Sequence, residues 1–331
     1  MAVYIFVSLQ NDDLISRFDI SRGVPESRLD FSVSGGPAPM TMNPQKTRLF
    51  VGMRKSNELV CLRIGGDAAL SLAARVSLPS DPCFVGMDHG GRYVFSSYYK
   101  AGQVAVHRWD ETNDAMTETQ RVDTEPKAHS VWLDPGDRYV YVPHTGPNKI
   151  YLYEFESSAG VLKARTPPWL TPEGHLEPRH LCFHPVLDRL YAINERSSTL
   201  SVYDCDRKDG SLKHRQTVST LPAAGIEGNL TAEIHVSPDG RFLYASNRGH
   251  NTIACFAVDG DTGSVKLMDY TPVPAVPRSF DFSPDGRFLY AAGLDTGELA
   301  AFELDRDSGR LAEFSRMFIG NSHMWVMSAS L

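Results

Sequence analysis

The chain has 331 residues, of which 42% are hydrophobic and 22% charged, with a formal net charge of −7. This acidic balance without any basic run argues against a nucleic-acid-binding protein. No apolar segment reaches the roughly 18 residues of a membrane span, and the stretch MAVYIFVSLQNDD lacks the basic region of a signal peptide. Five scattered cysteines without a C-x-x-C pair favour buried thiols in a reducing compartment. We therefore expect a cytoplasmic protein.

In chain order, six segments repeat one pattern. Each has an apolar strand, a tight turn related to Pro-Asp-Gly, an arginine, a second apolar strand, a polar loop and a third alternating strand. The segments are 40–64, 85–109, 131–155, 181–205, 234–258 and 280–304. The turns fall at positions 44, 89, 135, 185, 238 and 284, so the period is 45 to 53 residues. This period is typical of a four-stranded propeller blade, and no segment predicts a helix.

The two chain ends complete a further blade. Residues 3–20 read as second and third strands without a first strand, and residues 323–330 read as a first strand with nothing after it. Joining them closes the ring and removes exposed sheet edges. The sequence thus predicts an all-β, seven-bladed β-propeller over residues 1–331, as one domain whose last blade is closed by strands from both termini. We expect a short C-terminal deletion to be poorly tolerated.

The stretch LEPRHLCFHP contains two histidines four residues apart, His180 and His184. On a helix this spacing would place both rings on one face, as in zinc sites. On a strand, four residues span about 13 Å. The repeat assigns this stretch to an inner strand, so we expect no metal site here and predict that His184 belongs to the turn at the far end.

Two positions of the repeat should open on the same end of the propeller. Six residues before each turn, with the last blade extrapolated, stand Ala38, Cys83, His129, Arg179, Ala232, Arg278 and His323, and the next position adds His180 and Glu233. In the loop after the second strand stand Arg54, Tyr99, Thr145, Glu195, Arg248 and Leu294. Many of these residues are cationic although the chain is acidic, which indicates a site for an anion or for developing negative charge. The alternative is a set of solvated loop residues.

Within this set Glu195 is a carboxylate among cations, so we expect it to ionise readily and to act as a base or to position water. These residues and the blade phrases resemble the seven-bladed propeller lactonases, which include bacterial 6-phosphogluconolactonase and fungal 3-carboxy-cis,cis-muconate lactonizing enzyme. The resemblance covers the whole chain and rests on KAHS (127–130), EPRHLCFHP (177–185), INERS (193–197), AEIHVSPDGR (232–241), VPRSF (276–280) and MWV (324–326). It implies the functional residues His129, Arg179, Glu195 and Arg278. The sequence departs from the family at His323.

We therefore predict a lactonase without metal or cofactor that hydrolyses a sugar-acid lactone such as 6-phosphoglucono-δ-lactone, in the pentose phosphate pathway. Glu195 or His129 would take the proton from water, and Arg179 and Arg278 would stabilise the oxyanion. The expected substrate-binding residues are Arg54, Tyr98, Lys100, His180, Glu233, Arg248 and His323. The alternatives are a muconate-type cycloisomerase and a propeller scaffold without chemistry. The expected partner is a small anionic lactone or carboxylate, with no nucleic acid or membrane, and the chain is expected to be a monomer or weak homo-oligomer.

Overall fold

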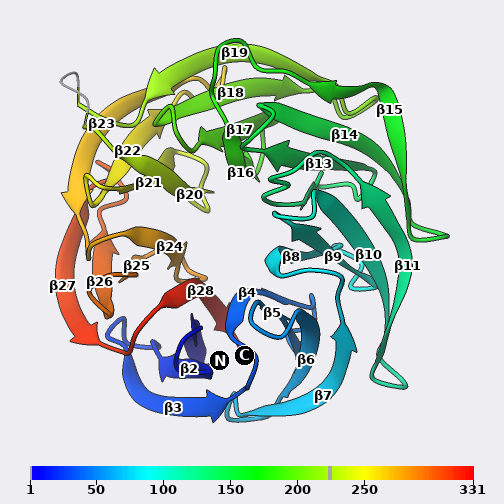
Figure 1. The fold of residues 1–331 in the computed structure, drawn as a ribbon. Helices are drawn as coiled ribbons and strands as arrows, with labels where there is room; N and C mark the ends of the chain where they lie inside the picture. The colour runs from blue at the N-terminus through cyan, green and yellow to red at the C-terminus, as the bar shows by residue number, and fades with distance from the viewer. Residues whose placement is uncertain (1, 223–225) are drawn as a thin grey trace.

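Seven four-stranded antiparallel sheets surround a common axis in the computed structural model, which describes residues 2–222 and 226–331 (Figure 1). Within each sheet the strands are hydrogen-bonded in order from the axis outward. This arrangement is a seven-bladed β-propeller, and all 28 described elements are strands. The predicted fold class is confirmed. Within the described residues, no helix is long and apolar enough to cross a membrane.

The strands of equivalent rank have similar lengths, apart from the short β12. The innermost strands are β28 (His323–Ser330), β4 (Pro37–Met42), β8 (Pro82–Met87), β12 (Trp132–Leu133), β16 (Pro178–Phe183), β20 (Leu230–Val236) and β24 (Pro277–Phe282). The second strands are β1 (Val3–Leu9), β5 (Arg48–Met53), β9 (Tyr93–Tyr98), β13 (Tyr139–His144), β17 (Arg189–Asn194), β21 (Phe242–Arg248) and β25 (Phe288–Gly293).

The third and fourth strands form the outside of the ring. The third strands are β2 (Leu14–Asp19), β6 (Glu58–Ile64), β10 (Gln103–Asp110), β14 (Lys149–Glu156), β18 (Thr199–Cys205), β22 (Thr252–Val258) and β26 (Glu298–Leu304). The fourth strands are β3 (Glu26–Ser32), β7 (Leu70–Ser77), β11 (Ala115–Asp123), β15 (Val161–Leu170), β19 (Leu212–Ser219), β23 (Val265–Pro272) and β27 (Leu311–Phe318).

The core is divided among the blade interfaces. Each of seven buried clusters joins side chains of two neighbouring blades; Phe95 on β9 and Val140 on β13, for example, lie in one of them. Second and third strands are buried almost throughout because blades cover both of their faces, whereas fourth strands alternate between exposed and partly buried residues. The five cysteines are buried and unpaired, as expected.

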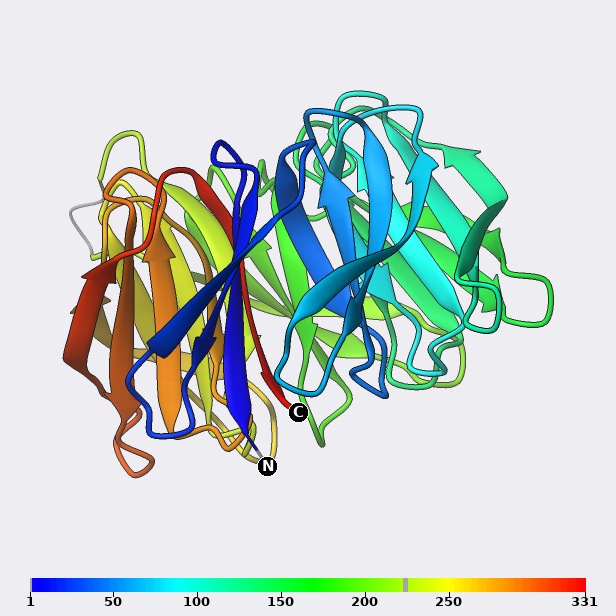
Figure 2. The same cartoon turned by 90° about the horizontal axis from the view of Figure 1, so that it is seen from below.

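Both chain ends lie in one blade, where β28 pairs with β1 from Val3 to Leu9 (Figure 2). This confirms the predicted closure. At the opposite end of β16, His184 serves a turn: its Nδ1 accepts the backbone N–H groups of Val186 and Leu187 at 3.1 and 2.9 Å, and its Nε2 donates to the carbonyl of Gly240 at 3.0 Å. The structure therefore assigns His184 to the turn, as predicted.

Candidate active site

Most inner strands are interrupted near their first residues by a β-bulge. In β16 the pairing passes from Pro178 to His180 and leaves Arg179 out of the ladder. In β24 it skips Arg278 in the same way, and β4, β8, β20 and β28 have similar shifts. A bulge changes the direction of its side chain and is common next to active sites. The position that the repeat singled out is therefore a structural device that turns side chains away from the regular ladder.

The prediction for the seventh blade was wrong by one residue. In β28 the pairing passes from Trp325 to His323 and skips Met324, so Met324 occupies the bulge. His323 is 2% exposed, and neither of its ring nitrogens has a hydrogen-bond partner among the described residues. The reason is that no turn follows β28, so its position could only be extrapolated from the other blades. The structure does not bring His323 into the arginine cluster described next.

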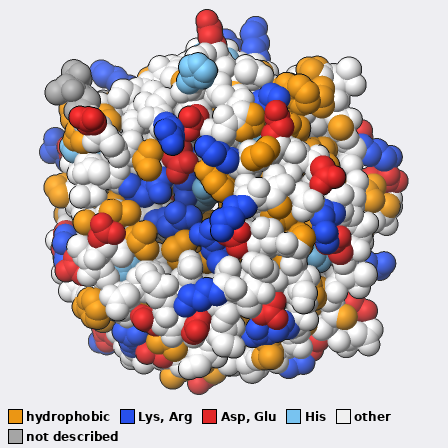
Figure 3. All heavy atoms as spheres, in the orientation of Figure 1, with side chains coloured by type: hydrophobic (Ala, Val, Ile, Leu, Met, Phe, Trp, Pro, Cys, Tyr) orange, Lys and Arg blue, Asp and Glu red, His pale blue; other side chains and the backbone are white. Residues whose placement is uncertain are grey.

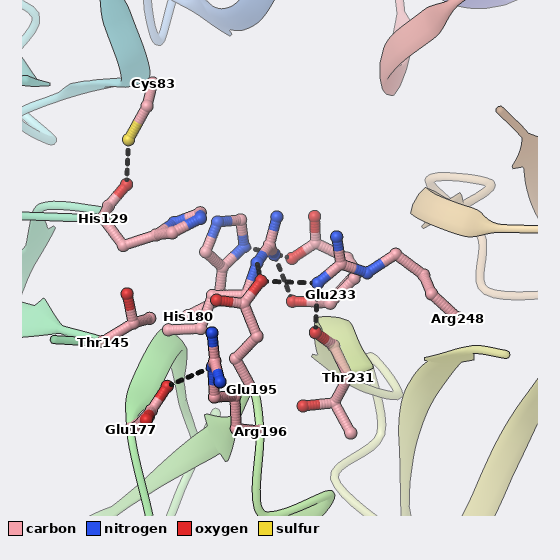
Figure 4. A network of polar contacts seen from close by, with 12 residues as sticks. Cys83, His129, Thr145, Glu177, His180, Glu195, Arg196, Thr231, Glu233 and Arg248 are labelled. Carbon is pink, nitrogen blue, oxygen red and sulfur yellow. Dashed lines mark hydrogen bonds and ion pairs between the residues drawn. The ribbon is translucent and has the colours of Figure 1, made fainter. Parts of the chain in front are cut away.

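Glu195, in the loop after β17, holds two arginines from different elements (Figure 4). Its Oε1 lies 2.5 Å from Nη2 of Arg248 and 3.5 Å from Nε of Arg179. Arg248 also donates to the carbonyl of Thr231 at 2.8 Å, and Arg179 donates to that of Ala232. Burial acts to raise the pKa of Glu195, but Arg179 and Arg248 outweigh it and lower that pKa. Glu195 is thus ionised, and its ion pairs make it a poor proton acceptor.

Arg54, Arg179 and Arg248 each have an ion pair, whereas Arg278 has no ion pair or side-chain hydrogen bond with any described residue. Burial, followed by repulsion from Arg179, Arg248 and Arg54, lowers its pKa to about 9. The pKa of Arg179 is lowered to about 10, first by burial and then by Arg248. Both groups stay charged at neutral pH. In the space-filling view, Lys and Arg side chains gather around a central hollow at this end of the axis (Figure 3). The site therefore has an excess of positive charge that an anion would neutralise.

A second ion-paired group lies at the rim. Nη2 of Arg54 is 2.9 Å from Oδ2 of Asp81, and Nζ of Lys100 is 3.7 Å from Oδ1 of the same carboxylate. Lys100 is largely exposed, with 76% of its side chain accessible. Asp81 was not predicted from the sequence. The available signal was its place as an acidic residue directly before the inner strand β8. Asp81 reduces the charge that Arg54 offers to a ligand.

Tyr98 was predicted to bind substrate, but the structure places it in the core. It is fully buried between two blades, and its hydroxyl is 2.8 Å from the hydroxyl of Ser96. Because successive strand residues point to opposite faces, the next residue, Tyr99, takes the other direction. Its ring lies 5.7 Å from that of His129, and its hydroxyl accepts a hydrogen bond from Thr145 at 3.4 Å. Tyr99 is therefore the tyrosine beside the site.

His129 lies in the segment that leads into β12. Burial, followed by the positive charges of Arg179, His180 and Arg278, holds its pKa well below the usual range, so the ring is neutral. The carbonyl of His129 accepts the thiol of Cys83 at 2.8 Å. Burial raises the pKa of Cys83, so this thiol is not an activated nucleophile. His129 is thus a neutral base without an ion pair among the described residues, unlike Glu195 and His180.

His180 and Glu233 form a buried pair below the arginines. The distance from Nδ1 of His180 to Oε1 of Glu233 is 2.8 Å, and the two side chains are 1% and 3% exposed. Burial acts to raise the pKa of Glu233, but His180 and the hydrogen bond lower it to about 2. Burial lowers the pKa of His180 to about 4. At neutral pH an ionised Glu233 thus accepts a hydrogen bond from a neutral His180, and neither side chain is exposed enough to be a surface ligand.

This pair predicts an acid-labile contribution to stability. Glu233 has an ordinary pKa of 4.5 when unfolded and about 2 when folded, so its contribution is complete above pH 4.5 and is lost as the pH falls toward 2. Urea unfolding of wild type and Glu233→Gln at pH 7, 5 and 3 measures this contribution. The difference in unfolding free energy should be the same at pH 7 and 5 and smaller at pH 3. An unchanged difference at pH 3 would contradict the low pKa.

The fold and this cluster define a propeller with a cationic site at one end of its axis. The chain matches the family described as Lactonase, 7-bladed beta-propeller, over residues 4–328. It is 33% identical over 296 residues to the 6-phosphogluconolactonase of Enterobacter sp. (strain 638), covering 89% of both chains, and 33% identical over 294 residues to that of Cronobacter sakazakii, covering 88% of both. The solved structure of Pseudomonas aeruginosa periplasmic gluconolactonase superposes with a TM-score of 0.91 at 25% identity, covering 100% of this chain and 99% of that one.

The protein belongs to the seven-bladed β-propeller lactonase family. This confirms the resemblance on which the sequence-based expectation relied.

Proposed function

We propose that the protein hydrolyses a sugar-acid lactone, 6-phosphoglucono-δ-lactone first among them, in the pentose phosphate pathway. The observation that carries the proposal is Arg278, a partly exposed guanidinium without a partner among the described residues, close enough to Arg179 and Arg248 for their charges to lower its pKa. The carbonyl oxygen of a lactone becomes an oxyanion during hydrolysis, and these arginines are fixed hydrogen-bond donors that can stabilise its charge. The names of the 6-phosphogluconolactonases from Enterobacter and Cronobacter support the same substrate class.

Hydrolysis needs a proton acceptor for the attacking water, and His129 suits this role better than Glu195. Glu195 is occupied by Arg179 and Arg248, whereas His129 is neutral and unpaired. In this mechanism the water oxygen attacks the carbonyl carbon while His129 takes a water proton. Arg179 and Arg278 stabilise the oxyanion, and the proton then passes to the ring oxygen as its bond to the carbonyl carbon breaks. Glu195 keeps the two arginines oriented.

The phosphate of the substrate would lie toward the rim. Arg54 and Lys100 both pair with the carboxylate of Asp81, and Arg248 is a third cation of the site. Arginine binds phosphate through two parallel hydrogen bonds, so Arg54 and Arg248 are the stronger candidates. Because four arginines supply the positive charge, we propose that no metal takes part. We also propose a cytoplasmic location, which the five unpaired cysteines support.

A panel of phosphorylated and unphosphorylated sugar lactones, with a carboxymuconolactone for comparison, tests the proposal. Acid release is followed in a pH-stat and corrected for spontaneous hydrolysis. We expect the highest kcat/KM for 6-phosphoglucono-δ-lactone, the same rate with EDTA, and a rise in Tm on adding 6-phosphogluconate, because a ligand bound only by the folded state stabilises it. Absence of lactone hydrolysis across the panel would overturn the proposal.

A further inference from the structure

Glu233 dictates which nitrogen of His180 carries the proton. The carboxylate is ionised and lies 2.8 Å from Nδ1 of His180, so Nδ1 must be the donor. A neutral imidazole has one donor and one acceptor nitrogen, and therefore Nε2 of His180 carries a lone pair. Apart from His180, the ionisable groups near Glu233 are Arg179, the buried thiol of Cys182 and His235, whose Nε2 is 3.9 Å from Oε1. Burial raises the pKa of Cys182, so this thiol stays neutral.

Two enclosed nitrogens on neighbouring histidine rings have no partner among the described residues. Nε2 of His180 and Nδ1 of His129 are both buried without a hydrogen bond to any described residue. The two rings are neighbours, with centroids 5.1 Å apart and planes at 65° (Figure 4). Enclosed polar atoms in proteins nearly always have a partner. Nε2 of His180 is an acceptor, so a proton on Nδ1 of His129 would satisfy both atoms after a small rotation of the His129 ring.

That tautomer leaves the lone pair of His129 on Nε2. This atom is not among the enclosed unpartnered atoms of the described residues, and the ring lies beside Tyr99 and near Arg179 and Arg278. Protonation of His129 during catalysis would place another positive charge near Arg179, Arg248 and Arg278, which is unfavourable. Glu233 is the buried carboxylate that offsets this cost through His180.

We propose that Glu233 and His180 are positioning residues for His129: Glu233 sets the tautomer of His180, His180 sets that of His129, and Nε2 of His129 receives the water proton. The inference rests on the proposed lactone hydrolysis. Nε2 gains the proton as water bonds to the carbonyl carbon and returns it to the leaving ring oxygen, so each turnover ends in the starting state. Both Nδ1–H bonds stay intact, and Glu233 stays ionised. The proton of the acid product leaves with solvent.

The substitution Glu233→Gln tests these positioning roles, because glutamine still accepts a hydrogen bond but carries no charge. We expect kcat to fall at least about 10-fold with little change in KM. The imidazolium of His129 loses its compensating charge, so the pKa of the base falls and the acid limb of kcat/KM moves to lower pH. Glu233→Asp, which keeps the charge, should restore the wild-type limb in part. A merely structural role would leave the pH profile unchanged.

His235→Gln is the matched control. His235 contacts the same carboxylate from a cavity of about 290 Å³ on the opposite face, which Asp281 also lines. Its loss should leave kcat and the acid limb as in wild type. An equal shift of the pH profile in His235→Gln, or a wild-type pH profile in Glu233→Gln, would overturn the proposed roles of Glu233 and His180.

Nitrogen NMR of the histidines provides a readout that does not require activity. We expect protons on Nδ1 of both His129 and His180 in wild type, and a change at both rings in Glu233→Gln. An Nε2 proton on either ring in wild type would overturn the proposed tautomers. If wild type hydrolyses no lactone, the proposed function fails while these spectra still decide the tautomers. If wild type is active and Glu233→Gln has the same kcat and pH profile, only the proposed roles of Glu233 and His180 fail.

Discussion

Replacing Arg278 with methionine should lower kcat/KM by about 10²–10³-fold, the usual cost of removing one oxyanion donor. The folded protein should nevertheless be at least as stable as wild type. Arg278 is partly exposed and has no partner among the described residues. Repulsion from Arg179, Arg248 and Arg54 therefore opposes folding, and methionine has a similar length without the charge. Initial rates with 6-phosphoglucono-δ-lactone and urea unfolding measure the two effects. The result would show that stability is given up locally for anion binding.

Arg287→Met is the control for this prediction. Arg287 belongs to the turn before β25, in the same blade but at the opposite end, where it is exposed and lies over the ring of Phe288. We expect wild-type kinetics. If Arg278→Met kept wild-type kcat/KM while remaining folded, Arg278 would not be part of the site. A large loss of stability would instead show that its charge is compensated in the folded protein.

Deleting residues 323–331 should abolish folding. β28 pairs with β1 along Val3–Leu9, and its loss would expose the edge of β1 and open the ring. It would also remove the buried side chains Met324 and Val326, each worth about 1.5–3 kcal/mol, and the hydrogen bonds from Ser328 to Asp281. The total is a large part of the roughly 5–15 kcal/mol that stabilises a folded domain.

Soluble yield, circular dichroism and size-exclusion chromatography measure the effect of this deletion. Removing Leu331 alone is the control, because it takes away one backbone hydrogen bond to Ala2 and leaves β28 complete. This shorter truncation should unfold cooperatively near the wild-type Tm. A cooperative transition in the longer deletion would mean that the ring closes without β28.

The sequence predicted the blades well because each turn fixes a distance along the chain to the bulge before it. This distance places Arg179 and Arg278 at the bulges of their strands, and it was off by one residue at His323, where no turn exists. Pairings between blades were harder to predict, since they depend on how neighbouring sheets pack. One signal was available. His180 and Glu233 are 53 residues apart, as are Glu195 and Arg248, and 53 is also the spacing of the two turns at 185 and 238.

The bulges have a consequence for how this protein family can diversify. Because a bulged side chain stands outside the strand pairing, exchanging it leaves the ladder of its own blade and of the other blades in register. Ala38, Cys83 and Ala232 occupy the same place as Arg179 and Arg278 but carry small side chains. Ligand preference can therefore change through substitution of one bulge residue at a time, while the seven-bladed fold stays the same.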